Sequence, residues 1–340
     1  MDNMKDSRSA RRTFLTQAST MGAAAVLGLH TSRAAAEPPS EIKHIRLVDA
    51  PTLCLAPQYL AEELLRLEGF SDIEYVKLPS GAGPQTIASG HADLTMWDTP
   101  SLLPVMDSAQ SLLVVGGVHS GCSELFGNER VKGIRDLRGK TVAVSAFGGT
   151  EHVFVSSTAA YVGLDPRKDI QWIEVGSIPD AMRMFIEGKS DAFMGFPPQP
   201  QELRARKVGH VLVNTLRDRP WSQYFCCSIV VNRSFVQRNP VATKRAIRAI
   251  LKAAEICADD PERAVRYMVS KGYETRPDIA REVLSNLPYR RWREANPEDT
   301  LRFHALRLHE AGMIKSDPQK LIAQGTDWRF LNELKKELKA

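Results

Sequence analysis

Beyond Pro39, short apolar runs of strand length alternate along the chain with stretches of helical periodicity. The expected strands are residues 44–50, 73–78, 92–97, 112–118, 141–144, 170–175, 192–194, 211–213 and 225–231. Glycines such as Gly69, Gly90 and Gly163 end the helical stretches between them. Strands that alternate with helices are typical of parallel sheets with helices on their faces. The pattern therefore predicts an α/β fold.

After the last of these strands, the pattern is helical to the end of the chain. Proline suits the first turn of a helix, where a backbone N–H has no partner in any case. The prolines that mark expected helix starts are Pro240, Pro261, Pro277, Pro297 and Pro318. Leu331, Leu334 and Leu338 form an apolar stripe on the last expected helix. We expect these helices to pack back over the first part of the fold.

Two segments of the alternating region echo one another, residues 88–94 and 186–192. In each, a helix stops at a glycine, and an aspartate, Asp93 or Asp191, precedes an apolar strand. The spacing Gly-x-x-Asp is common in such loops, so coincidence is the alternative. The matching helix and strand around it favour an internal repeat.

The first 36 residues have the pattern of a secretory signal. Arg11 and Arg12 form a twin-arginine pair, residues 18–29 are mildly apolar, and residues 34–36 are three alanines. These features, in this order, predict export by the twin-arginine route, cleavage near Ala36 and a periplasmic mature chain. The apolar run is too short to span a bilayer. An uncleaved anchor or an unstructured tail is the alternative.

Charge and cysteine content narrow the class of protein further. The formal net charge of +5 falls to about +2 after cleavage, because five basic and two acidic residues lie in the first 36 positions. The chain has no basic stripe with interleaved aromatic residues, so we expect no nucleic-acid partner. Five cysteines without regular spacing argue against a disulfide framework.

Four segments, taken in their order along the chain, resemble a known family. They are residues 90–94, 134–144, 159–166 and 188–193, and the stretch DLRGKTVAV at 136–144 is the strongest. In these segments the chain resembles periplasmic substrate-binding proteins of the nitrate/sulfonate/taurine type, which include binders of thiamine-pyrimidine precursors.

This resemblance implies a type II periplasmic-binding-protein fold, with two parallel-sheet lobes, a ligand cleft between them and C-terminal helices. The chain would cross between the lobes near residues 124–129 and 219–225. The expected division is 1–36 signal peptide, 37–125 first part of lobe I, 126–219 lobe II, and 220–340 return to lobe I with the C-terminal helices. The implied partners of such a monomer are a small-molecule ligand and an inner-membrane ABC permease with its ATPase, with no cofactor.

Ligands of open α/β sheets bind beyond the carboxyl ends of the strands. This rule selects the candidate ligand-binding residues Cys54, Ser80, Gly81, Trp97, Asp98, Thr99, His119, Cys122, Ser145, Phe147, Gly148, Gly149, Thr150, Phe196, Trp221 and Tyr224.

Two parts of this set bear on the polarity of the ligand. Residues 145–150 place backbone N–H groups at a helix start, which favours an acceptor or an anion, although an ordinary glycine turn is the alternative. Trp97 offers a flat apolar wall, and Asp98 is either an acceptor for the ligand or the cap of the helix that begins at Thr99. Together they favour a taurine-like amino-sulfonate, an amino acid-like compound or an amino-substituted heterocycle. Bare nitrate would meet Asp98 as a like charge.

Histidine and cysteine residues raise the question of a metal. His119 and Cys122 lie close in sequence, but no third and fourth ligand follows at a suitable spacing, so we expect no metal site. Cys226 and Cys227 are adjacent in an expected strand, so we expect their side chains to point to opposite faces. A buried structural role is expected for them, and a reactive thiol is the alternative.

The chain has no G-x-S-x-G, P-loop, H-E-x-x-H or G-x-G-x-x-G motif, and we expect no catalytic residue. The expected function is the periplasmic solute-binding component of an ABC importer. A thiamine-pyrimidine biosynthetic enzyme of the same fold and a ligand-sensing periplasmic domain are the alternatives.

Overall fold

The structure is a computed structural model that describes residues 37–78 and 83–339. The expected signal peptide, and the candidate residues Ser80 and Gly81, lie outside the described residues. Two five-stranded sheets organise the described chain from Pro39 onward. The first has the order β2-β1-β3-β10-β4, and the second has the order β7-β6-β8-β5-β9. The predicted α/β class is confirmed.

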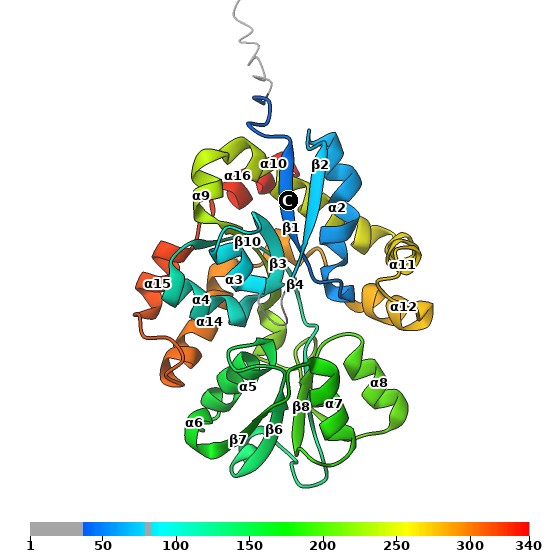
Figure 1. The fold of residues 1–340 in the computed structure, drawn as a ribbon, viewed down its shortest axis with the longest axis vertical. Helices are drawn as coiled ribbons and strands as arrows, with labels where there is room; N and C mark the ends of the chain where they lie inside the picture. The colour runs from blue at the N-terminus through cyan, green and yellow to red at the C-terminus, as the bar shows by residue number, and fades with distance from the viewer. Residues whose placement is uncertain (1–36, 79–82, 340) are drawn as a thin grey trace, which may run out of the picture. The chain divides into compact units, whose positions relative to one another are not determined.

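The strands of the first sheet are β1 (His44–Asp49), β2 (Asp72–Lys77), β3 (Leu94–Asp98), β4 (Leu112–Ser120) and β10 (Phe225–Asn232). Those of the second are β5 (Glu124–Gly127), β6 (Lys140–Val144), β7 (Ile170–Glu174), β8 (Ala192–Gly195) and β9 (His210–Asn214). We call the first sheet with its helices lobe I and the second sheet with its helices lobe II. In Figure 1, lobe I carries helices from both ends of the chain, coloured blue and yellow to red, whereas green helices cover lobe II.

Both sheets are mixed rather than purely parallel. β10 runs antiparallel to β3 and β4, and β5 runs antiparallel to β8 and β9. These two strands follow the two crossings, so each enters its new sheet from the end opposite to the other strands. The sequence did not predict β5, because its four residues, Glu-Leu-Phe-Gly, hold only two apolar side chains.

Helices cover both faces of the lobe I sheet. Those of lobe I are η1 (Leu53–Leu55), α2 (Ala56–Leu67), α3 (Gly83–Ala88), α4 (Thr99–Ala109), α9 (Arg233–Arg238), α10 (Pro240–Asp259), α11 (Pro261–Ser270), α12 (Pro277–Asn286), α13 (Arg291–Glu294), α14 (Pro297–Glu310), α15 (Pro318–Gly325) and α16 (Arg329–Glu337). One apolar cluster joins the sheet to α2 and α10 to α12, and a second joins it to α4, α14 and α15. All nine residues of β4 are buried between these layers. The predicted return of the C-terminal helices to the first part of the fold is confirmed.

Lobe II is smaller and has its own apolar core. Its helical segments are η2 (Ile134–Leu137), α5 (Thr150–Tyr161), α6 (Pro166–Asp169), α7 (Ile178–Ile186) and α8 (Gln199–Arg206), and the 3-10 turn η3 (Trp221–Gln223) lies on the way back to lobe I. Separate clusters pack around α5 and around α7.

The first crossing between the lobes is only three residues long, Gly121, Cys122 and Ser123, because β5 already begins at Glu124. The sequence placed this crossing a few residues later. Thr215, which follows β9 at the start of the return path, binds the first crossing: its Oγ1 accepts hydrogen bonds from Cys122 N at 3.2 Å and Ser123 N at 3.0 Å. The same hydroxyl donates to Ser123 O at 2.8 Å. The two crossings are thus held together at one point.

Candidate functional site

Asp98 is the last residue of β3 and the N-cap of α4. Its Oδ2 accepts a hydrogen bond from Ser101 N at 3.2 Å, and its Oδ1 accepts one from Ser101 Oγ at 2.7 Å. Thr150, the first residue of α5 in lobe II, donates from Oγ1 to the same Oδ1 at 2.5 Å. Asp98 is therefore both a helix cap and a contact between the lobes.

A second carboxyl group, Glu151, lies beside this contact. It is 1 % exposed, and its Oε2 accepts a hydrogen bond from Ser145 Oγ at 3.1 Å. Among the described residues, nothing bonds to its Oε1. Burial raises the pKa of Asp98 against the opposing hydrogen bonds of Thr150 and Ser101. Burial, together with the charge of Asp98, also raises the pKa of Glu151. The two carboxyls therefore favour a donor or a cation nearby.

Two small cavities meet at Asp98 and Ser123. The cysteine-side cavity, of about 60 Å³, is lined by Ala50, Thr52, Cys54, Leu55, Trp97, Asp98, Cys122, Ser123, Thr150, Phe196 and Cys227. The tryptophan-side cavity, of about 20 Å³, is lined by Asp98, Pro100, Gly121, Ser123, Phe154, Met194, Thr215, Trp221, Tyr224, Phe225, Cys226 and His304. Since a cavity needs roughly 10–15 Å³ to hold one water, the cysteine-side cavity has room for more than one water molecule. Neither set of described lining residues includes a lysine or an arginine.

The tryptophan-side cavity also holds two nitrogen-bearing rings. Trp221 is 7 % exposed, and its Nε1 has no hydrogen-bond partner among the described residues. His304 of α14 lies 3.2 Å, Nδ1 to Oγ, from Ser157 of α5, so this pair also joins the lobes. Burial lowers the pKa of His304 to about 3, which keeps the ring neutral. The indole N–H is thus a donor that a bound molecule could satisfy.

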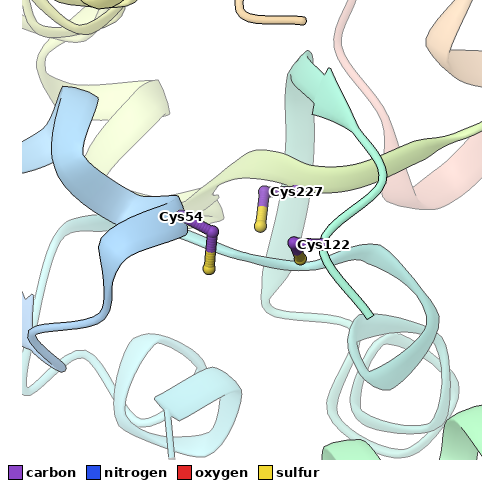
Figure 2. A group of neighbouring side chains, drawn as sticks. All are labelled: Cys54, Cys122 and Cys227. Carbon is purple, nitrogen blue, oxygen red and sulfur yellow. The ribbon is translucent and has the colours of Figure 1, made fainter. Parts of the chain in front are cut away.

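Cysteines form one wall of the cysteine-side cavity. Cys122 of the first crossing is joined to Cys226 of β10 by a disulfide, contrary to the expectation from cysteine spacing. Cys54 and Cys227 are buried free thiols, and a hydrogen bond between them lowers the pKa of Cys54. Cys226 meets Cys122 in the disulfide, and the neighbouring Cys227 meets Cys54. Figure 2 shows Cys54, Cys122 and Cys227 together, with all three sulfur atoms within 4.8 Å of one another.

The NMT1/THI5-like family matches residues 70–264, which is more than half of the chain. The chain belongs to this family. The resemblance to the nitrate/sulfonate-binding type is thereby confirmed. No curated protein matches the sequence. No described helix of this NMT1/THI5-like protein is long and apolar enough to cross a membrane.

Solved structures whose sequences are 10–19 % identical to this chain share its fold. The periplasmic nitrate-binding protein NrtA from Synechocystis PCC 6803 aligns with a TM-score of 0.74 at 17 % identity, over 89 % of this chain and 90 % of that one. The alkanesulfonate-binding protein SsuA from Xanthomonas axonopodis pv. citri, bound to MOPS, gives 0.69 at 17 % identity over 85 % and 99 %. SsuA from Escherichia coli gives 0.62 at 17 % identity over 84 % and 92 %. These likenesses confirm the two-lobed periplasmic-binding-protein fold.

Eight of the residues selected from the sequence line the two cavities of this NMT1/THI5-like protein: Cys54, Trp97, Asp98, Cys122, Thr150, Phe196, Trp221 and Tyr224. The ring of Trp97 lies directly against Gly83, where a Cβ could not fit. Asp98 caps α4, as one alternative predicted, and it also lines both cavities.

Other selected residues lie outside the cavities. Thr99 is buried and donates from Oγ1 to Cys226 O at 3.1 Å. His119 is buried behind η1, with its Nε2 3.0 Å from Cys54 O, and burial lowers its pKa to about 4. Both therefore support the wall of the site rather than face the space within it.

The glycine loop 145–149 differs most from the expectation. Phe147 is 55 % exposed, and its backbone N–H donates to Glu174 Oε1 at 3.1 Å. Gly148 N donates to His152 Nδ1 at 3.1 Å, and Gly149 N donates to Ala146 O at 3.1 Å. The donors expected to meet an anion are thus used within lobe II. Only Thr150, through its side chain, reaches the cavity.

Four residues in or beside the two cavities were missed by the sequence reasoning: Ser123, Glu151, Thr215 and His304. Glu151 follows the glycine loop directly, and an acid in the first turn of a helix is common enough to be read as a dipole partner. Ser123 and Thr215 belong to the crossings, whose positions depend on where β5 begins. His304 was not selected, because it lies within a helix, α14, rather than beyond the end of a strand. A polar residue beside a crossing is the signal that could have found Ser123 and Thr215.

Proposed function

We propose that this chain is the solute-binding component of an ABC importer and that it binds a small polar organic molecule without changing it. The observation that carries this proposal is the pair of cavities at the junction of two lobes, closed by Thr150 of lobe II on Asp98 of lobe I. Two short crossings beside the same cavities suit hinge closure around a ligand. The family and the fold support this role, since the similar proteins include nitrate- and alkanesulfonate-binding proteins.

The charges around the cavities favour a ligand with a donor end. Asp98, which is partly buried, lines both cavities, the buried Glu151 lies beside it, and the described lining residues include no lysine or arginine. A bare oxyanion such as nitrate would lose its hydration without gaining a cationic partner. An amino group could donate to Asp98, while the N–H of Trp221 could serve an acceptor at the other end of the ligand. An amino-substituted heterocycle or a taurine-like compound has this polarity.

The proposal extends to export and partners. The mature chain begins at or near Glu37, reaches the periplasm by the twin-arginine route, and delivers its ligand as a monomer to an ABC permease and ATPase. The functional division is lobe I from residues 37–120 and 225–340 and lobe II from 124–214, with the crossings at 121–123 and 215–224. Replacing both Arg11 and Arg12 by lysine should leave precursor in the cytoplasm. Normal periplasmic levels of this double variant would contradict the route.

Ligand binding tests the central claim. Calorimetry with an aminopyrimidine, taurine, nitrate and sulfate should give saturable binding for an amino compound and none for the bare anions. Asp98→Asn should weaken that binding by about 1–3 kcal/mol, because a charged acceptor becomes a neutral amide. Asp317→Asn is the matched control, since Asp317 caps α15 through Lys320 N at 2.9 Å, away from both cavities.

Two outcomes would overturn the proposal. Tight binding of nitrate with Asp98 intact would show that the carboxylate does not select the ligand. Conversion of the bound compound by the purified protein, followed by mass spectrometry, would favour the biosynthetic enzyme instead.

A further inference from the structure

Three cysteine sulfurs from separate parts of the chain meet at the wall of the cysteine-side cavity. Cys54 lies in η1, Cys122 in the first crossing and Cys227 in β10 (Figure 2). Every pair of these sulfur atoms lies within 4.8 Å. Cys257, the remaining free cysteine, is buried in α10 and belongs to the apolar core.

The spacing of the three sulfurs is close to that of a metal-thiolate site. A Zn–S bond of about 2.3 Å places two sulfurs of a tetrahedral site about 3.8 Å apart. The three Sγ atoms therefore need to approach one another by no more than about 1 Å, a distance that small side-chain rotations supply. Their backbone segments are well held: Cys54 O lies 3.0 Å from His119 Nε2, and Tyr289 Oη donates to Leu53 O at 3.3 Å.

The sulfur of Cys122 takes part in a disulfide, and this bond would compete with a metal ion for the same atom. Cys122 forms the disulfide with Cys226, so only Cys54 and Cys227 are free thiols in this structure. We propose that the reduced protein binds one thiophilic divalent metal ion through Cys54, Cys122 and Cys227, and that the Cys122–Cys226 disulfide excludes the ion. This proposal does not rest on the proposed solute-binding function.

Charge selects a divalent ion over a monovalent one. Three thiolates beside Asp98, which lines the same cavity, bring up to four negative charges into a buried space. A divalent ion cancels two of these charges and a monovalent ion only one, so Zn(II) leaves the smaller uncompensated charge. The cavity on the open side of the three sulfurs has room for a water molecule as the fourth ligand, as in zinc sites that keep one position open.

Formation of the site requires reduction of the disulfide. A phosphine attacks the Cys122–Cys226 bond and is oxidised by two electrons to the phosphine oxide, whose oxygen comes from water. The two protons of that water complete two thiols. Binding of Zn(II) then releases the protons of those thiols that become ligands.

Zinc binding under anaerobic conditions, measured by competition with a chromophoric chelator, tests the proposal. Oxidised protein should bind no Zn(II) at this site, and phosphine-reduced protein should bind one equivalent. Cys122→Ser and Cys226→Ser form a matched pair, because both remove the disulfide but only the first removes a proposed ligand. We expect reduced Cys226→Ser and Cys257→Ser to retain one equivalent and Cys54→Ser, Cys122→Ser and Cys227→Ser to lose it.

Substitution with Co(II) adds a direct readout of the ligands. A thiolate-to-cobalt charge-transfer band should appear in reduced wild-type protein and in Cys226→Ser, and should be absent from Cys122→Ser. Circular dichroism establishes that each variant is folded, and if Cys54→Ser or Cys227→Ser fails to fold, the Cys122 and Cys226 pair carries the test. Equal zinc binding by that pair, equal binding by oxidised and reduced protein, or no binding by folded, reduced wild-type protein would each overturn the proposal.

Discussion

Strands β3 and β8 occupy equivalent places in the two lobes, and at their amino ends they are built alike. Asp93, just before β3, accepts hydrogen bonds from Arg46 N at 2.9 Å and from the Arg46 guanidinium at 2.6 Å. Asp191, just before β8, accepts from Thr141 N at 3.0 Å and from Arg130 Nε at 2.7 Å. In each lobe the aspartate thus ties its strand to the neighbouring parallel strand and to an arginine.

At their carboxyl ends the same two strands differ. β3 ends in Trp97 and Asp98, whereas β8 ends at Gly195 and is followed by Phe196. Asp98 and Phe196 line the same cavity from opposite lobes. The two strands are therefore alike at the end that ties the sheet together and differ at the end that lines the cavity. Lobe I contributes Asp98 to the cavity, and lobe II contributes Phe196 and the hydroxyl of Thr150, with the carboxyl of Glu151 beside them.

The largest expected effect is on stability, and it is expected at the amino ends of β3 and β8, where the two lobes are alike. Asp93→Ala and Asp191→Ala each remove a buried acceptor and leave a backbone N–H and an arginine without it. Each should lower the free energy of unfolding by about 2–4 kcal/mol in urea titrations. The affinity of the folded protein for its ligand should stay unchanged. A loss in one lobe alone would show that the two aspartates are not equivalent.

The pH dependence of stability should distinguish the amino ends of β3 and β8 from the carboxyl groups beside the cavities. Although burial opposes ionisation, hydrogen bonds from Thr141, Asn128 and Arg130 lower the pKa of Asp191 from 3.8 to about 2. Because the folded-state pKa is lowered, the stabilisation is complete above the unfolded pKa near 4 and is lost as pH falls through 2. It amounts to about 2 kcal/mol. The difference in unfolding free energy between wild type and Asp191→Asn should shrink accordingly between pH 5 and pH 2.

For the two carboxyl groups beside the cavities, the pH dependence of stability has the opposite sign. Burial raises the pKa of Asp98 and of Glu151, so the folded protein holds these protons more tightly than the unfolded chain does. Their contribution to stability is present below the unfolded pKa and falls as pH rises through the folded one. An acid titration in which Glu151→Gln behaves like Asp191→Asn would contradict this contrast.

The amino ends of β3 and β8, which are alike in the two lobes, were predictable from the sequence. Their carboxyl ends, which differ, were predictable only in part. The Gly-x-x-Asp repeat, the strand pattern and the helix-start prolines depend on local backbone requirements, which adjacent residues encode. Asp98 and Trp97 could be placed because they end a recognisable strand. The loop 145–149 could not, because its N–H groups are taken by Glu174 and His152, which local spacing does not reveal.

The cysteines show the same limit. Spacing argued against a disulfide, but the Cys122–Cys226 bond joins the first crossing to β10, and these segments become neighbours only after β10 has paired in the lobe I sheet. The grouping of Cys54 with Cys122 and Cys227 depends on the same long-range arrangement. A group of residues that come from segments before and after lobe II in the sequence leaves no local sequence pattern.

A smaller effect is expected at the donor in the tryptophan-side cavity. Trp221→Phe removes the indole N–H, which has no partner among the described residues, but keeps an aromatic ring in place. If a ligand accepts this hydrogen bond, affinity should fall by about 1 kcal/mol, or roughly fivefold. Trp172→Phe is the control, since its Nε1 donates to Pro166 O at 2.8 Å within lobe II. Equal affinity for Trp221→Phe and wild type would remove Trp221 from the site.

The smallest effect concerns how the unlike lobes are held closed. Glu202 of α8 in lobe II pairs with Arg276 at the start of α12 in lobe I. Such partly exposed pairs contribute about 0.5 kcal/mol and are screened by salt. Glu202→Gln should therefore weaken ligand binding about twofold at low salt and leave it unchanged in high salt. Glu262→Gln is the matched control, because Glu262 pairs with Arg281 entirely within lobe I.

If the closed form depends on the Glu202–Arg276 pair, small-angle scattering of the ligand-free protein should show a larger radius of gyration for Glu202→Gln at low salt only. The same change in Glu262→Gln would mean that the loss of any surface charge, rather than a link between the lobes, opens the protein.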